Sequence, residues 1–152
     1  MKSINQSINR LLIQIDKIDK ISDAEWKKTL NQRKLDELEF HDKDRGESHI
    51  EERITSDTYE KFYGNKKYYT TVKRSNDFIK KWIEYECKGK VFLDYACGNG
   101  ENALYAAQSG ADLSLGFDIS GVSVQNAREK ASDLKLNNIR FFQADAENTL
   151  LP

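Results

Sequence analysis

The stretch that decides the fold is VFLDYACGNGENA, residues 91–103. It opens with a short apolar run that ends in an acid, Asp94, and continues through a glycine-containing turn into a segment rich in alanine. That segment ends at Gly110, a residue typical of the end of a helix. The order predicts a strand, a turn and a helix.

The same order repeats on the C-terminal side of this stretch. Leu113–Phe117 is a second apolar run and is followed by Asp118, and Ile139–Ala144 is a third run followed by Asp145. An apolar stripe at helical spacing lies between them, formed by Val124, Ala127, Ala131 and Leu134. Strands that alternate with helices predict parallel βαβ units. We therefore expect an α/β fold: a Rossmann-like parallel half-sheet with strand order 3-2-1, preceded by N-terminal helices.

The residues before this half-sheet are polar and helix-like. One stripe at steps of three and four predicts a first helix, with Ile4, Ile8, Leu11, Ile15 and Ile18 on one face. Ser22 and Glu25 have the spacing of a capping box, which predicts a second helix to about Phe40. Residues 41–56 are expected to form a loop, and Ser75 or Asp77 to begin a third helix. This divides the chain into an N-terminal helical or lid region, 1–74, and a cofactor-binding domain, 75–152.

Composition excludes several classes. Of 152 residues only two are cysteine and two are histidine, too few for a disulfide scaffold or a zinc finger, and no metal site is expected. The chain has 24 Lys and Arg against 25 Asp and Glu, a net charge of −1, which argues against a dedicated partner among nucleic acids or membranes. No run approaches the length of a membrane span and residues 1–20 are unlike a secretory signal, so a cytoplasmic protein is expected.

Three acids, Asp94, Asp118 and Asp145, each follow a predicted strand. The carboxyl ends of parallel strands lie at one edge of the sheet, where ligands of such folds bind. A row of carboxylates repels a polyphosphate and suits hydroxyl groups, an amine or a cation. This favours a ligand without phosphate.

The turn after the first strand also fits the dinucleotide fingerprint, with Gly98, Gly100 and Ala103 in its positions and Asp118 where a ribose-binding acid is expected. By itself this pattern does not decide which adenosine-containing cofactor binds. A helix N-terminus normally holds the pyrophosphate of NAD, but here Asp94 and Glu101 would lie against it. S-adenosylmethionine carries no phosphate, and Asp94 could hold its amino group.

At three strand ends the sequence resembles the class I S-adenosylmethionine-dependent methyltransferases, particularly those related to the quinone-biosynthesis methylases. Residues 91–100 are similar to their first motif, 116–120 to the second and 142–147 to the third. The resemblance implies that Asp94 and the turn cradle the methionine part, the turn being Ala96, Cys97, Gly98, Asn99 and Gly100. It implies that Asp118, with Ile119, binds the ribose hydroxyls and that Asp145 and Ala146 meet the adenine edge. The family's first glycine is Ala96 here, which we expect to have a negative φ.

The resemblance implies methyl transfer, and we expect a small-molecule acceptor. No catalytic residue is assigned: His41 and Tyr69 are weak candidates for a general base, and Cys97 is not expected to be a nucleophile. The sequence ends before the family's fourth strand, so we expect an N-terminal part of such an enzyme, with a homo-oligomer or a separate C-terminal half completing the sheet. Two alternatives remain, the nucleotide-binding half of an NAD-dependent oxidoreductase and an inactive fragment or partner-binding module.

Overall fold

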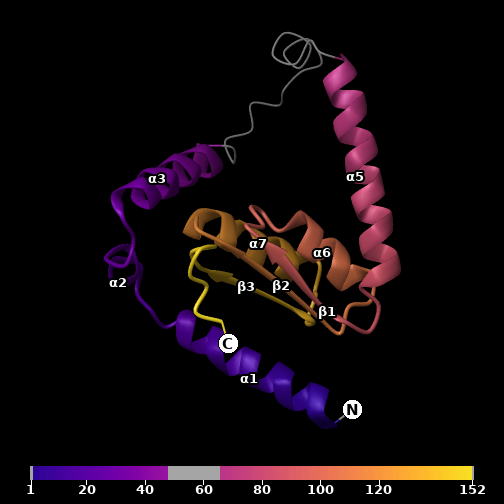
Figure 1. The fold of residues 1–152 in the computed structure, drawn as a ribbon, viewed down its shortest axis with the longest axis horizontal. Coiled ribbons are helices and arrows are strands. Elements are labelled where there is room, and N and C mark those ends of the chain that lie inside the picture. The colour runs from indigo at the N-terminus through magenta and orange to yellow at the C-terminus, as the bar shows by residue number, and fades with distance from the viewer. Residues whose placement is uncertain (1, 48–65, 152) are drawn as a thin grey trace.

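The computed structural model describes residues 2–47 and 66–151 (Figure 1). Its elements in chain order are α1 (Lys2–Ile18), α2 (Asp23–Lys27), α3 (Gln32–Glu47), α5 (Lys66–Glu86), β1 (Val91–Tyr95), α6 (Glu101–Gln108), β2 (Leu113–Asp118), α7 (Gly121–Asp133) and β3 (Ile139–Gln143). This confirms the predicted α/β class. Within the described ranges no helix is both long and apolar enough to cross a membrane.

The sheet has three parallel strands in the order β1-β2-β3, which confirms the predicted order. Asp94 of β1 lies opposite Gly116 of β2, and Phe117 of β2 lies opposite Phe142 of β3. Every residue of β2 is buried, as expected for a central parallel strand covered on both faces. The carboxyl ends of all three strands therefore lie side by side.

One face of the sheet is covered by α5, α6 and α7. Phe141 and Ile139 of β3 pack on this face against alanines and leucine of α6 and against α7, in a cluster with Ala103, Leu104, Ala107, Val124, Ala127 and Ala131. The end of α5 packs beside it, where Ile83 and Cys87 contact Ala106 of α6. The alternation of β3 side chains and the helical stripe of α7 produce this layer.

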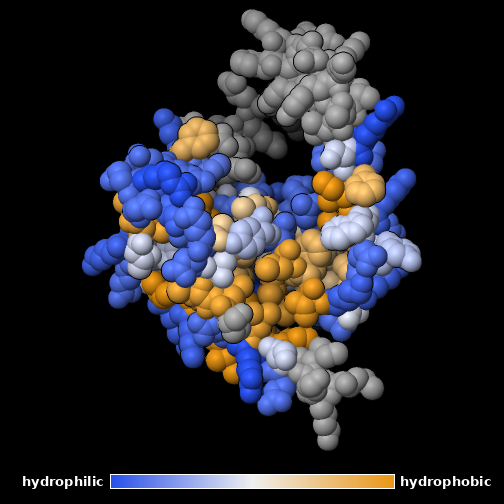
Figure 2. All heavy atoms as spheres, in the orientation of Figure 1, coloured by the Kyte–Doolittle hydropathy of each residue, from blue (hydrophilic) through white to orange (hydrophobic). Residues whose placement is uncertain are grey.

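The other face is covered by α1, which lies alongside the sheet (Figure 1). Ile15 and Ile18 are buried against Leu115, Phe117 and Phe142, so the predicted stripe of this helix packs on its own domain. The cover stops short of β1, whose second face remains exposed: Val91 is 43%, Leu93 45% and Tyr95 55% exposed. Figure 2 shows this as apolar surface between α1 and α5.

Two predictions for the N-terminal region are wrong. The capping box of Ser22 and Glu25 is present, but the helix that follows it, α2, ends at Lys27 and not near Phe40. A new helix, α3, begins at Gln32, and the Asn31 side chain caps it by accepting the Lys34 backbone N–H at 3.1 Å. Residues 41–47, expected to form a loop, continue α3. Tertiary contacts stabilise this polar segment, because Asp42 accepts a hydrogen bond from the Ser120 hydroxyl at 2.6 Å. Residues 48–56 lie outside the described residues.

The helix expected to begin at Ser75 or Asp77 already begins at Lys66. It therefore runs through the proposed boundary between residues 74 and 75, and the division of the chain into two regions stays a prediction. The side chain of Tyr69, one candidate for a general base, lies outside the described residues.

Candidate functional site

The turn between β1 and α6 is built on three left-handed residues. Ala96 has φ 55°, Gly98 φ 53° and Gly100 φ 77°. The Cys97 N–H donates to the Phe117 carbonyl at 2.9 Å, which ties the turn to the end of β2. The expected negative φ of Ala96 is wrong: the turn alternates left-handed residues, and the alanine adopts this conformation at a cost of about 1–2 kcal/mol.

Close packing explains two of the glycines. A Cβ atom on Gly100 would lie 2.6 Å from the Phe141 ring and 2.9 Å from the Ala127 Cβ. A Cβ atom on Gly116, on the neighbouring strand, would lie 2.5 Å from the same ring. Phe141 is 3% exposed, and its ring packs against both glycines. Sequence reasoning missed this residue, because an aromatic side chain in an apolar strand is an ordinary core residue.

Asp118 connects the first and second motifs. Its Oδ2 accepts the Gly98 backbone N–H at 2.8 Å, and its Oδ1 accepts the Ser120 backbone N–H at 3.0 Å. The residue is 9% exposed, so these two amides hold a largely buried carboxylate in one orientation. Each carboxylate oxygen accepts up to two hydrogen bonds, which leaves acceptor capacity for the hydroxyl groups of a ligand.

Asp94 caps the N-terminus of α6 from the base of the turn. Its Oδ2 accepts the Ala103 backbone N–H at 3.1 Å. Burial raises the pKa of Asp94, the hydrogen bonds from Ala103 and Asn102 lower it, and the negative charge of Asp118 raises it further. The helix N-terminus, where a pyrophosphate would bind in a dinucleotide fold, is thus already neutralised by the protein's own carboxylate. A cation placed beside Asp94 would relieve the cost of burying its charge.

Cys97 lies between these two acids. Burial raises the pKa of the Cys97 thiol to about 12, with further contributions from the charges of Asp94 and Asp118. At neutral pH the group is a protonated thiol, and the thiolate is the nucleophilic form. The structure therefore supports a packing role for Cys97.

Asp145 and Ala146 follow β3 and lie at the same edge of the sheet as Asp118. The Ala144 N–H donates to the Asp118 carbonyl at 3.0 Å, which joins the second and third strand ends. Asp145 forms an ion pair with Lys34 of α3, and Lys34 Nζ also lies 2.9 Å from Glu147 Oε2. Hydrogen bonds to both acids raise the pKa of Lys34. The third motif is therefore held by a residue of the N-terminal region.

A cavity of about 170 Å³ lies between these strand ends and α3. The strand ends contribute predicted site residues to its lining, namely Ala96, Asp118, Ile119, Asp145 and Ala146. The other predicted residues form the turn and its base beside the cavity, namely Asp94, Cys97, Gly98 and Gly100. Helix α3 supplies the opposite wall with Lys34, Glu37 and His41.

The α3 wall was missed by sequence reasoning except for His41, which was named as a weak candidate for a general base. His41 is half-buried and lines the cavity from within α3. No motif marks Lys34 or Glu37 in a run of charged residues. The steps of three and four from Lys34 to Glu37 to His41 could have indicated one helix face, but only if the helix had been predicted to continue beyond Phe40.

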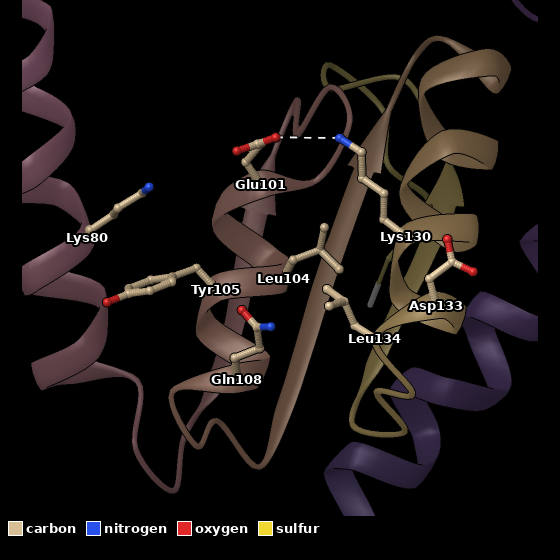
Figure 3. Close-up of a pocket in the computed structure, with 8 residues that line it drawn as sticks. All are labelled: Lys80, Glu101, Leu104, Tyr105, Gln108, Lys130, Asp133 and Leu134. Atoms are coloured by element: carbon tan, nitrogen blue, oxygen red, sulfur yellow. Dashed lines mark hydrogen bonds and ion pairs between the residues drawn. The ribbon is translucent and has the colours of Figure 1, made fainter. Parts of the chain in front are cut away.

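A larger cavity, of about 450 Å³, lies on the outer side of the helical layer (Figure 3). Residues of α5, α6 and α7 line it, among them Lys80, Tyr105 and Lys130. Figure 3 shows Glu101 reaching across it to Lys130, at 3.5 Å. It contains none of the three strand-end acids, so the candidate site is the smaller cavity.

Comparison with known proteins agrees with this geometry. Residues 86–152 match a family model described as a methyltransferase domain. A ribosomal protein L11 methyltransferase of Clostridium botulinum is 33% identical over 67 residues, which are 44% of this chain and 20% of that protein. The chain thus matches about a fifth of this relative's length.

Solved structures are similar over about half of the chain. A Trypanosoma brucei PRMT1 enzyme-prozyme complex with AdoHcy is 30% identical, with 55% of this chain and 25% of that chain covered and a TM-score of 0.44. An rRNA methylase of Streptococcus thermophilus is 16% identical, with 43% and 37% covered and a TM-score of 0.41.

These comparisons correct one prediction. A small-molecule methyl acceptor was expected, and this is wrong, because the relatives are named as methyltransferases of a ribosomal protein.

The alternative of an NAD-dependent oxidoreductase is not favoured, because the matching family model and the relatives are methyltransferases. The resemblance found in the three motifs is therefore confirmed for residues 86–152, which match a methyltransferase domain.

Proposed function

We propose that this chain is the cofactor-binding part of an S-adenosylmethionine-dependent methyltransferase whose acceptor is a macromolecule. One observation carries the cofactor assignment. The cationic side chains that line the strand-end cavity, Arg33 and Lys34, are ion-paired with carboxylates of the same lining, and the helix N-terminus beside the cavity is capped by Asp94 rather than open to an anion. This arrangement suits a ligand with hydroxyl and amino groups and disfavours one with a pyrophosphate.

Different residues of the chain would bind different parts of the ligand. Asp94 would hold the amino group of the methionine part, because its buried charge gains most from a cation. Asp118, already oriented by two backbone amides, would accept from the ribose hydroxyls, with Ile119 beside it. Asp145 and Ala146 would meet the adenine edge. S-adenosylmethionine itself supplies the methyl group, attached to a sulfonium that is a good leaving group.

The turn between β1 and α6 would shape the backbone that contacts the ligand. Left-handed residues at Ala96, Gly98 and Gly100 bend the backbone close to the cavity. A rigid turn supported by Phe141 would fix the methionine part, and positioning of the acceptor would provide most of the acceleration. No residue of the described chain is assigned as a general base.

Isothermal titration calorimetry with S-adenosylmethionine, S-adenosylhomocysteine and NAD tests the cofactor assignment. We expect binding of the first two and none of NAD. Asp118→Asn should weaken S-adenosylhomocysteine by about tenfold or more, because the asparagine amide places a donor where the carboxylate now accepts. Asp112→Asn is the matched control, since Asp112 is exposed before β2. Binding of NAD without S-adenosylhomocysteine would refute the proposal.

The acceptor class is tested separately with methyl-labelled S-adenosylmethionine and a cell extract. A macromolecular acceptor predicts label that stays with the extract on dialysis and becomes sensitive to protease or to ribonuclease. Label found only in the dialysable fraction would contradict a macromolecular acceptor while leaving the cofactor assignment intact.

A further inference from the structure

The contact between α3 and the third motif is specific. Lys34 is 8% exposed, and its ammonium group forms ion pairs with Asp145 Oδ2 and, at 2.9 Å, with Glu147 Oε2. The pair with Asp145 is largely shielded from solvent, so its separation would leave both charges poorly compensated. Its three N–H donors allow it to hold both acids at once.

The second oxygen of Asp145 is held from another direction. Asp145 Oδ1 accepts the backbone N–H of Glu147 at 2.9 Å. The carboxylate is therefore fixed at both oxygens, by a side chain of α3 on one side and by its own loop on the other. Each oxygen keeps a further lone pair, and Asp145 lines the cavity.

Helix α3 is itself anchored at two more places. Leu38 is 2% exposed and is buried with Trp26 and Leu30, with Ile119 packed against them. Near the other end of the helix, Asp42 accepts the Ser120 hydroxyl at 2.6 Å. These contacts make α3 a wall of the cavity that stays in place, and they keep Lys34 beside Asp145.

We infer that Lys34 is a positioning residue that fixes the Asp145 carboxylate to accept a hydrogen bond from the exocyclic amino group of the cofactor's adenine. This rests on the proposed function, in which Asp145 meets the adenine edge. Without Lys34 the carboxylate would be held at one oxygen only and could rotate away. The role is one of orientation, and Lys34 itself need not touch the ligand.

A ligand pair that differs only in the base edge tests this role. S-adenosylhomocysteine carries the amino group, and its hypoxanthine analogue has a carbonyl oxygen in its place. We expect the unaltered chain to prefer the adenine ligand by about tenfold or more, as for a hydrogen bond to a charged acceptor. Both dissociation constants are measured by calorimetry with the whole chain.

Lys34→Met should raise the dissociation constant of the adenine ligand by about tenfold and leave that of the hypoxanthine ligand nearly unchanged, so that the preference for adenine is lost. Lys34→Arg keeps the charge and should restore part of the preference. Lys27→Met is the matched control, because it removes an ion-paired lysine of the same region that lies 2.8 Å from Asp23 and does not line the cavity. This control should retain the full preference. If Lys34→Met does not fold, Lys34→Gln, which is similar in length and uncharged, replaces it.

Two results would overturn the role of Lys34 alone. Equal weakening of both ligands would mean that Lys34 only supports the N-terminal region, and tighter binding of the adenine ligand would mean that Lys34 competes with the base for Asp145. Failure of the unaltered chain to bind S-adenosylhomocysteine would instead overturn the proposed function, and this inference with it.

Discussion

Gly116→Ala is the sharpest test of how the turn is supported. The new Cβ would lie 2.5 Å from Phe141 Cε1, 2.6 Å from Cδ1 and 3.1 Å from Cys97 Sγ. Phe141 is 3% exposed and surrounded by α6 and α7, so its ring has little room to move. Overpacking of this kind lowers the free energy of unfolding by about 1–3 kcal/mol.

The loss is measured by urea unfolding followed by circular dichroism, with Phe141→Leu as the second arm of a double-mutant cycle. The smaller leucine makes room, so Gly116→Ala should cost clearly less in that background, with a coupling of about 0.5–3 kcal/mol. Gly116 is not among the glycines with positive φ, so the cost there is steric, whereas Gly89→Ala, at φ 66° with nothing within 4 Å of the new methyl group, shows the cost of backbone strain without a clash. An equal cost of Gly116→Ala in both backgrounds would refute the packing argument.

The same variant connects packing with binding. The Phe141 ring also lies 2.6 Å from the Cβ position of Gly100, so a displaced ring disturbs the turn that the proposed cofactor would contact. We expect Gly116→Ala to weaken S-adenosylhomocysteine as well as to lower stability. Full affinity in a destabilised variant would show that the turn does not depend on Phe141.

Three further predictions concern the turn and its acids. Ala96→Gly should leave the free energy of unfolding unchanged or raise it by up to about 1 kcal/mol, because it relieves the strain of a left-handed alanine. Ala103→Gly in α6 should instead lower the free energy of unfolding by about 0.5–1 kcal/mol or more. Urea unfolding of both variants checks the sign of each change. The raised pKa of Asp94 means that the folded state binds this proton more tightly than the unfolded state does. The free energy of unfolding should therefore fall as the pH rises from 3.8, the ordinary pKa of the group, through the raised pKa of the folded state, and Asp94→Asn should abolish this part of the pH dependence. A series of denaturation curves across pH that shows no difference between the two proteins would contradict this prediction. Cys97, with a thiol pKa of about 12, should react with iodoacetamide at pH 8 far more slowly than a free thiol, and rapid alkylation of Cys97 found by peptide mass spectrometry would contradict its burial between two acids.

The half-sheet could be predicted from sequence because its signals are local. Three apolar runs, each followed by an acid, mark the strands, and Gly110 marks the end of a helix, as the structure confirms. The candidate site residues followed from the rule that ligands bind at the carboxyl ends of parallel strands. Their roles toward a cofactor stay predictions.

The N-terminal region could not be predicted as well, because tertiary contacts decide it. Residues 41–47 have little to bury and were expected to form a loop, yet Asp42 binds Ser120 from within α3. The α3 wall of the cavity depends on an ion pair between Lys34 and Asp145, which periodicity cannot reveal. Ala96 was misjudged because propensity favours a negative φ, while the hydrogen bond between Cys97 and the end of β2 fixes the turn.

The link between Lys34 and Asp145 joins residues that are 111 positions apart in the chain. Contacts of such high sequence separation close a long loop, and their entropic cost makes them late events in folding. The strands and α6 and α7 can assemble from neighbouring segments, whereas α3 docks on residues that follow the second and third strands, namely Ile119, Ser120 and Asp145. We therefore expect the cavity to be completed when this early segment of the chain returns to the strand ends.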